Sequence, residues 1–170
     1  MTTQMHNTLR PGTYTIDTAR SACRLTATHT FGLKPVAATV DLRGGTITVA
    51  GDLAASTASA VLDAGTFRSD DERRNKDIAG RKFFDAAQHP TIAFRSTGCR
   101  RGEEGWLLDG VLRVRGHDSD VTLAIEVARS TPDGCHVVAT GVIDRIAAGI
   151  TAGRALIARP VRVVLDLHAC

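Results

Sequence analysis

Apolar and polar residues alternate with a period of two along most of this chain. In the first such segment Leu25, Ala27, His29 and Phe31 share one side, and threonines and an arginine occupy the other. Successive side chains of a β-strand point to opposite faces, so this pattern predicts strands that bury one face. The same alternation returns in segments 36–43, 46–49, 92–94, 106–114, 121–127, 138–142 and 161–167.

Turn-forming residues separate these segments. Gly44-Gly45 is predicted to make a hairpin turn, and further turn clusters stand at 102–105, 116–118 and 131–134. Strands joined by such short connections form an antiparallel meander. The pattern therefore predicts an all-β fold.

One segment interrupts the alternation. Ser69 followed three residues later by Glu72 has the form of a capping box, which predicts a helix over Asp70–Ala79 that ends at Gly80. A second turn over 81–88 extends this helical cap to about residues 70–88. One helix within a meander is typical of a barrel or half-barrel with one covered end. Small inward residues (Ala27, Ala38 and Gly110) suggest that the barrel interior is not completely filled.

The composition limits the class of protein. A chain of 170 residues fits one domain, which we place at 13–168 after a flexible N-terminal segment, 1–12. The net charge of +3 comes from scattered arginines, and only 4% of residues are aromatic, so nucleic-acid binding is not expected. No apolar run approaches the ~18 residues of a transmembrane segment. The N-terminus lacks the pattern of a signal peptide, so we expect a cytoplasmic protein.

The sequence offers no motif for covalent or metal chemistry. The four cysteines are far apart and have no histidine at zinc-ligand spacing, so we expect free thiols and no metal. There is no nucleophile elbow, glycine-rich phosphate loop or His-x-x-x-His pair, and we therefore predict no catalytic residue and no cofactor.

A polar cluster leaves one alternative open. Arg73, Arg74, Asp77 and His89 (with Asp85 as a second acid) could act on a small anion at the capped mouth, with arginines holding the anion and the acid and histidine exchanging protons. A solvated helix face with acids and bases at i,i+4 spacing explains the same residues more simply.

Several motifs together resemble the YceI-like, polyisoprenoid-binding, lipocalin-like proteins. The central part of the resemblance is Asn75–Asp85 followed by His89–Ser96. Further similar elements are Tyr14–Asp17, His29 with Gly32, Asp109–Gly116 and Asp144-Arg145, in consistent order over about residues 13–168. The resemblance implies an eight-stranded antiparallel lipocalin-like barrel, a helix over one end, and an apolar channel for an isoprenoid chain.

The implied function is non-enzymatic binding, carriage or sequestration of an apolar, isoprenoid-type lipid. A fully packed barrel that binds a protein partner is a third possibility, and the oligomeric state, a homodimer included, stays open. Ala38 and Val40 stand where the family has Gly and Phe, so we expect a channel of altered shape. The residues expected to line it are Leu25, His29, Phe31, Val36, Ala38, Val40, Phe83, Phe84, Ile92, Phe94, Trp106, Leu108 and Leu112.

Overall fold

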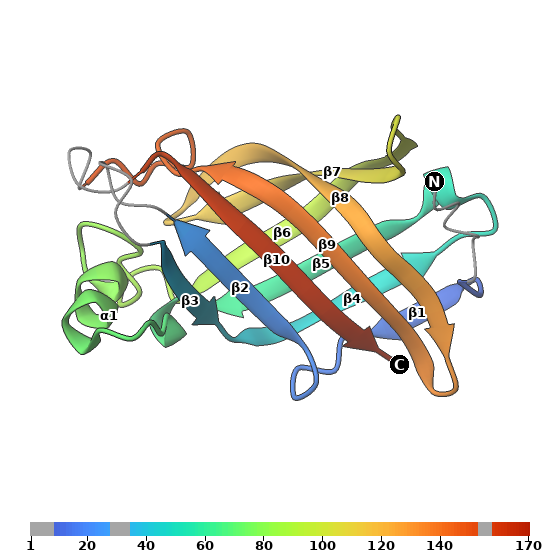
Figure 1. Ribbon diagram of the computed structural model, residues 1–170, viewed down its shortest axis with the longest axis horizontal. Coiled ribbons are helices and arrows are strands. Elements are labelled where there is room, and N and C mark those ends of the chain that lie inside the picture. The colour runs from blue at the N-terminus through green and yellow to red at the C-terminus, as the bar shows by residue number, and fades with distance from the viewer. Residues whose placement is uncertain (1–8, 28–34, 153–157) are drawn as a thin grey trace.

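Ten strands, one α-helix and two short 3-10 turns make up the computed structural model, which describes residues 9–27, 35–152 and 158–170 (Figure 1). The strands are β1 (Gly12–Thr15), β2 (Ala22–Ala27), β3 (Val36–Val40), β4 (Leu42–Val49), β5 (Thr57–Asp63), β6 (Thr91–Arg101), β7 (Trp106–Val114), β8 (His117–Thr131), β9 (Gly134–Asp144) and β10 (Pro160–Ala169). The helix is α1 (Glu72–Ala79), and the 3-10 turns are η1 (Leu53–Ala55) and η2 (Ala64–Thr66).

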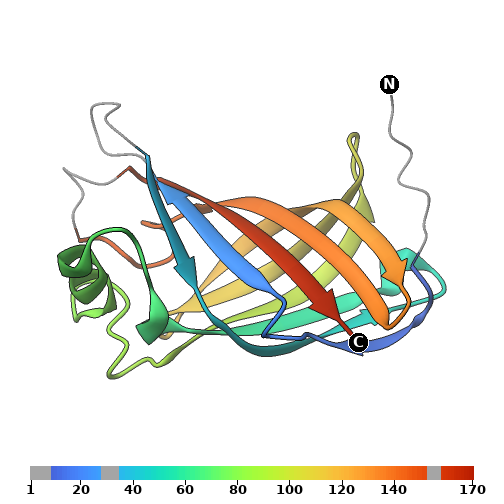
Figure 2. The same cartoon turned by 60° about the horizontal axis from the view of Figure 1, so that its bottom comes forward.

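All ten strands belong to one antiparallel sheet with the order β1-β4-β5-β6-β7-β8-β9-β10-β2-β3. The sheet curls around a single interior, with β10, β9 and β2 on one wall and β4, β5 and β6 on the opposite wall (Figures 1 and 2). At one end the sheet closes on itself, because residues at the end of β1 pair with residues at the end of β10: Thr15 and Cys170 exchange two backbone hydrogen bonds, and Ile16 bridges Ala169. The predicted all-β, antiparallel, lipocalin-like fold is confirmed.

The expected number of eight strands is wrong, since the sheet has ten. Alternation alone missed β5, whose inward residues are Ala58, Ala60 and Leu62, two of them alanines. The turn expected at Gly44-Gly45 is also wrong, because both glycines lie inside β4. A Cβ atom on Gly45 would lie 2.3 Å from the carbonyl oxygen of Ser59, so glycine here permits close strand contact.

The residues that face inward on β9 and β8 differ from the prediction. On β9 the buried side chains are Cys135, Val137 and Ala139, whereas Val142, expected inside, is 61% exposed. On β8 the pairing register with β9 shifts between Ile125 and Val127. A β-bulge adds one residue to a strand and reverses which residues face inward, so alternation fails beyond it.

The helix is shorter than expected and begins differently. Its N-cap is Asp71, whose carboxylate accepts hydrogen bonds from the backbone N–H groups of Arg73 and Arg74. Ser69 instead donates its hydroxyl hydrogen to Oδ1 of Asn75 at 2.7 Å, so the expected Ser69 capping box is wrong. Helix α1 ends at Ala79 as expected, but residues 81–88 form turns, not helix. The α1 region covers one end of the sheet (Figures 1 and 2).

Residues 1–8 of the predicted flexible segment lie outside the described residues. The described part contacts the barrel: the backbone N–H of Arg10 donates to Ser130, and Leu9 packs against the core. Within the three described ranges, no helix has the length and apolar character needed to cross a membrane.

Candidate apolar binding site

A cavity of about 240 Å³ occupies the barrel interior below α1. We call it the larger compartment. Its walls come from the inward faces of β2, β3 and β5–β10, and its lining is apolar apart from Arg74 and Arg145. The alternating direction of side chains along each strand produces this lining, since every second residue of each contributing strand points inward.

The covered end of the larger compartment is built from α1 and the turns that follow it. Ile78, Phe83 and Phe84 all line the compartment. The ring of Phe84 packs edge to face on Phe67, with 6.1 Å between ring centroids. Helix α1 is otherwise polar and contains no fully buried residue, so these apolar contacts attach the cap to the barrel.

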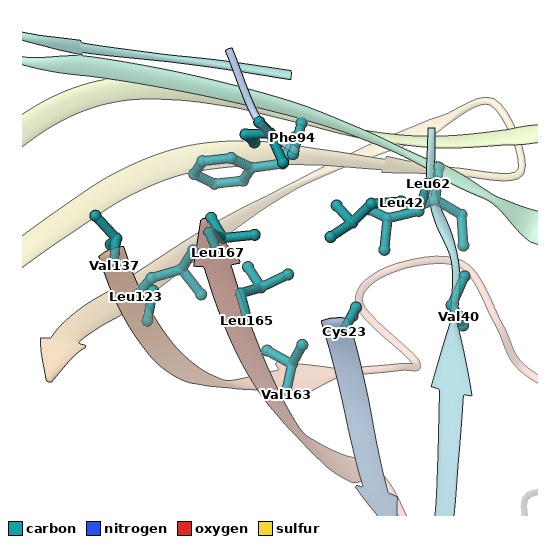
Figure 3. Close-up of a cluster of buried hydrophobic side chains, with 14 of the residues drawn as sticks. Cys23, Val40, Leu42, Leu62, Phe94, Leu123, Val137, Val163, Leu165 and Leu167 are labelled. Atoms are coloured by element: carbon teal, nitrogen blue, oxygen red, sulfur yellow. The ribbon is translucent and has the colours of Figure 1, made fainter. Parts of the chain in front are cut away.

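A second cavity of about 110 Å³, the smaller compartment, lies further along the same interior. Four residues line both compartments: Ala60, Phe94, Leu123 and Leu165. The Phe94 ring projects from β6 toward Leu165 and Leu167 on the opposite wall (Figure 3). Phe94 therefore stands at the boundary between the two compartments.

The residues expected to line a channel are divided between these cavities. Trp106 and Leu108 line the smaller compartment, and Phe94 lines both. His29 and Phe31 lie outside the described residues. The remaining expected residues, all lining the larger compartment, are Leu25, Val36, Ala38, Val40, Phe83, Phe84, Ile92 and Leu112.

Sequence reasoning missed several lining residues. Cys23 shares an inward face with Leu25 and continues its alternation, so the pattern could have included it. Burial raises the pKa of the Cys23 thiol to about 12, which keeps it protonated and unreactive. Phe67 and Ile150 come from irregular segments, where no periodicity exists to indicate an inward side chain.

Arg145 is the one buried charged residue of the described chain, with 7% of its surface exposed. Its Nη1 donates to the carbonyl oxygens of Ile150 (2.8 Å) and Ala152 (2.7 Å), and its Nε donates to that of Ala158 (3.1 Å). These bonds compensate the cost of burying the cation and hold the segments after β9 beside the larger compartment.

The neighbouring Asp144 faces outward and binds Arg159 through two short contacts, of 2.8 and 2.7 Å. Its Oδ1 also accepts hydrogen bonds from the backbone N–H groups of Ile146 and Ala147. The hydrogen bond from Arg159 is the main cause that lowers the pKa of Asp144 to about 2.

The four polar residues of the alternative site do not gather in the cavity. Arg74 lines the larger compartment and pairs with Asp70 at 3.0 Å, whereas Arg73, Asp77 and His89 are absent from its lining. No acid or histidine among the described residues lines either compartment. The cavity is therefore suited to apolar binding and offers no described group for proton transfer in its interior.

Comparison with known proteins agrees with this architecture. The chain resembles the crystal structure of BcnA from Burkholderia cenocepacia (TM-score 0.79, 19% identity, 91% of this chain and 99% of that chain covered). It also resembles a polyisoprenoid binding domain from Saccharophagus degradans implicated in plant cell wall breakdown (TM-score 0.68, 16% identity, 92% and 97% covered). A third similar structure is the YCEI protein of Campylobacter jejuni (TM-score 0.56, 14% identity, 77% and 82% covered).

No curated protein sequence matches the chain. At these identities the structural likenesses establish the fold alone. The family model for the YceI-like domain, however, matches residues 14–169, which is nearly the whole of the curled sheet and its cap. The chain belongs to the YceI-like domain family.

Proposed function

We propose that this protein binds one apolar, isoprenoid-type lipid in its interior and acts as a non-catalytic carrier or sequestering protein. The observation that supports this most directly is the larger compartment, whose lining is apolar except for two arginines. A site with so few polar groups selects its ligand by shape and apolar surface. The combined volume of the two compartments exceeds ~300 Å³, the lower end of ordinary small-molecule sites.

The energetics favour a flexible hydrocarbon chain. Burial of one methylene contributes ~0.8 kcal/mol, so three isoprene units offer roughly 12 kcal/mol before costs. Association and ordering cost ~4–15 kcal/mol. Because these magnitudes are similar, tight binding requires that nearly the whole chain be buried.

Family membership and one structural relative support the chemical class of the ligand. The Saccharophagus degradans domain is described as polyisoprenoid binding, and it shares this fold. We extend that ligand class to the present chain because its own cavity is apolar along its length.

The position of Arg74 suggests how the ligand is oriented. Arg74 is the more exposed of the two arginines in the lining, and its partner Asp70 lies in solvent with 93% of its side chain exposed. An amphipathic ligand would place a polar or anionic end near Arg74 and its hydrocarbon chain toward Phe94.

The test is native mass spectrometry of the purified protein, with lipid extraction to identify the ligand. A variant with Arg73, Arg74, Asp77 and His89 all changed to alanine should keep most of its lipid binding, since apolar burial supplies most of the affinity. Loss of all binding by this variant while it stays folded would refute the apolar-site proposal.

The two alternatives receive less support. An enzyme acting on a small anion would use Arg74, but Asp77 and His89 are not in the cavity lining. A fully packed partner-binding barrel disagrees with the presence of two internal compartments. Lipid binding accounts both for the absence of Asp77 and His89 from the lining and for the two internal compartments.

A further inference from the structure

Two histidines and an aspartate gather on the outer face of the barrel, away from the apolar interior. His136 is on β9, and Asp166 and His168 are on β10, the neighbouring strand (Figure 1). Leu165 and Leu167 point inward (Figure 3), so Asp166 and His168 share the outward face. His136 and His168 are direct register partners, and Asp166 is two residues before His168.

The donor atoms of these three side chains lie close together. Nε2 of His136 lies 2.7 Å from Oδ1 of Asp166, and Nε2 of His168 lies 3.8 Å from the same oxygen. The two imidazole rings are stacked, with centroids 4.3 Å apart and planes at 7°. The ligand atoms of all three residues lie within 4.8 Å of one another.

These distances are close to those of a metal site. Around a tetrahedral zinc ion with bonds of ~2.0–2.2 Å, neighbouring ligand atoms are about 3.4 Å apart. The His168–Asp166 separation is near this value, and the His136–Asp166 hydrogen bond needs to lengthen by less than about 1 Å. The side chains are half-buried on rigid strands, at 15%, 32% and 30% exposure in chain order, so little ordering is required.

We propose that His136, Asp166 and His168 form a three-ligand site for a divalent transition metal ion, with Zn²⁺ as the representative ion. Two imidazole nitrogens and one carboxylate oxygen suit Zn²⁺ or Cu²⁺, whereas Mg²⁺ and Ca²⁺ prefer oxygen ligands. Three protein ligands leave a fourth position for water. This site is independent of the lipid cavity, because it lies on the opposite face of the same strands.

Two arginines contact the proposed ligands and would compete with a metal ion for them. Nη2 of Arg129, the register partner of His136 on β8, lies 3.2 Å from Nδ1 of His136. Arginine can only donate, so Nδ1 accepts, and the imidazole proton is on Nε2, directed at Asp166. Arg24 lies 3.9 Å from the other carboxylate oxygen of Asp166.

Metal binding through Nε2 would require the imidazole proton of His136 to move from Nε2 to Nδ1. A neutral imidazole that coordinates through Nε2 carries its proton on Nδ1, where it would face the Arg129 guanidinium. Arg129 is exposed and able to turn into solvent. Removing its side chain should therefore raise the affinity for the metal, an effect opposite to that of removing a ligand.

The experiment is calorimetric titration of the full chain with ZnCl₂. The background variant is Cys170→Ser, since the exposed Cys170 thiol could itself bind zinc. We expect one Zn²⁺ per chain, a loss of affinity of at least about tenfold in His136→Ala and in His168→Ala, and a severalfold gain in Arg129→Ala. His89→Ala is the control histidine and should leave the affinity unchanged.

Thermal unfolding provides the second measurement. Zinc should raise the melting temperature of the background protein and of Arg129→Ala, but not that of folded His136→Ala. If zinc does not bind, or if His136→Ala and His168→Ala bind it as tightly as the background protein does, the three residues are a hydrogen-bonded surface cluster and the proposal is wrong.

Discussion

The ring of Phe94 occupies the space that a side chain at position 110 would need. A Cβ atom on Gly110 would lie 2.4 Å from Cε2 of Phe94 and 2.6 Å from the carbonyl oxygen of Arg95. Glycine on β7 thus allows the ring on β6 to lie where the two compartments meet.

Gly110→Ala should therefore force the Phe94 ring to move and reduce stability by ~1–3 kcal/mol, as overpacking of a core does. Urea unfolding measures this loss. Gly98→Ala, on the same hairpin, is the control, because a Cβ atom there meets nothing within 4 Å. Equal losses in the two variants would contradict the role assigned to Gly110.

Val40→Phe should shorten the longest lipid bound, because Val40 lines only the larger compartment. The cavity has room for the added ring, so we expect the variant to stay folded. Val142→Phe is the control and should leave the length preference unchanged, since Val142 is 61% exposed and lines neither compartment. Native mass spectrometry with isoprenoids of graded length checks the prediction. It fails if folded Val40→Phe shows the same length preference as the unchanged protein.

Phe84→Ala should loosen the cap, because it removes the edge-to-face contact with Phe67 and part of the cavity lining. We expect faster lipid release and a stability loss of about 3 kcal/mol, at the lower end for Phe→Ala because Phe84 is only partly buried. Stopped-flow measurement of ligand release tests this, with the exposed Lys82→Ala as control. Unchanged release from folded Phe84→Ala would show that the cap does not limit exit.

Acid should weaken the fold through Asp144, whose pKa is lowered to about 2 from an ordinary value of 3.8. A lowered pKa means that the carboxylate stabilises the fold above about pH 4 and that this contribution disappears as the pH falls toward 2. Asp144→Asn should thus have a lower urea midpoint than the unchanged protein at pH 6, and the difference should shrink at pH 3. A difference independent of pH would mean that the charge is not involved.

The four cysteines should react at very different rates. All four are free, Cys170 is exposed, and burial raises the pKa values of Cys23, Cys99 and Cys135. At pH 8 we expect one rapidly labelled thiol in the native protein and four after denaturation. Cys170→Ser should remove the rapid phase, and two or fewer thiols in the denatured protein would indicate disulfides.

Much of the fold could be predicted from alternation, because burial of one sheet face enforces it. Alternation over 161–167 predicts that Val163, Leu165 and Leu167 share one face, and these three residues do line the interior. The failures have local physical causes: a bulge changes the facing of β8 after Ile125, and the small side chains of β5 give little hydrophobic signal.

The cavity could be predicted only in part. Ala38 does line it, but the space beside Gly110, taken from the sequence as unfilled, holds the Phe94 ring. Arg145 and Ile150 enter the lining from irregular segments after β9, where position depends on tertiary contacts. The convergence of His136 on Asp166 and His168 required the pairing of β9 with β10, which no local pattern specifies.

The pairing of β10 with β2 has a consequence for the order of events during synthesis. Leu165 on β10 pairs with Cys23 on β2. The strand β2 therefore cannot form this pairing until β10 has been synthesised. Contacts so distant in sequence are slow to form, because a long loop must close before they stabilise anything. A ribosome-bound chain that lacks β10 has an open interior without one wall of its cavity. The cavity can therefore hold a lipid only once β10 has paired with β2 and β9, and until then the inward faces of the earlier strands are exposed apolar surface.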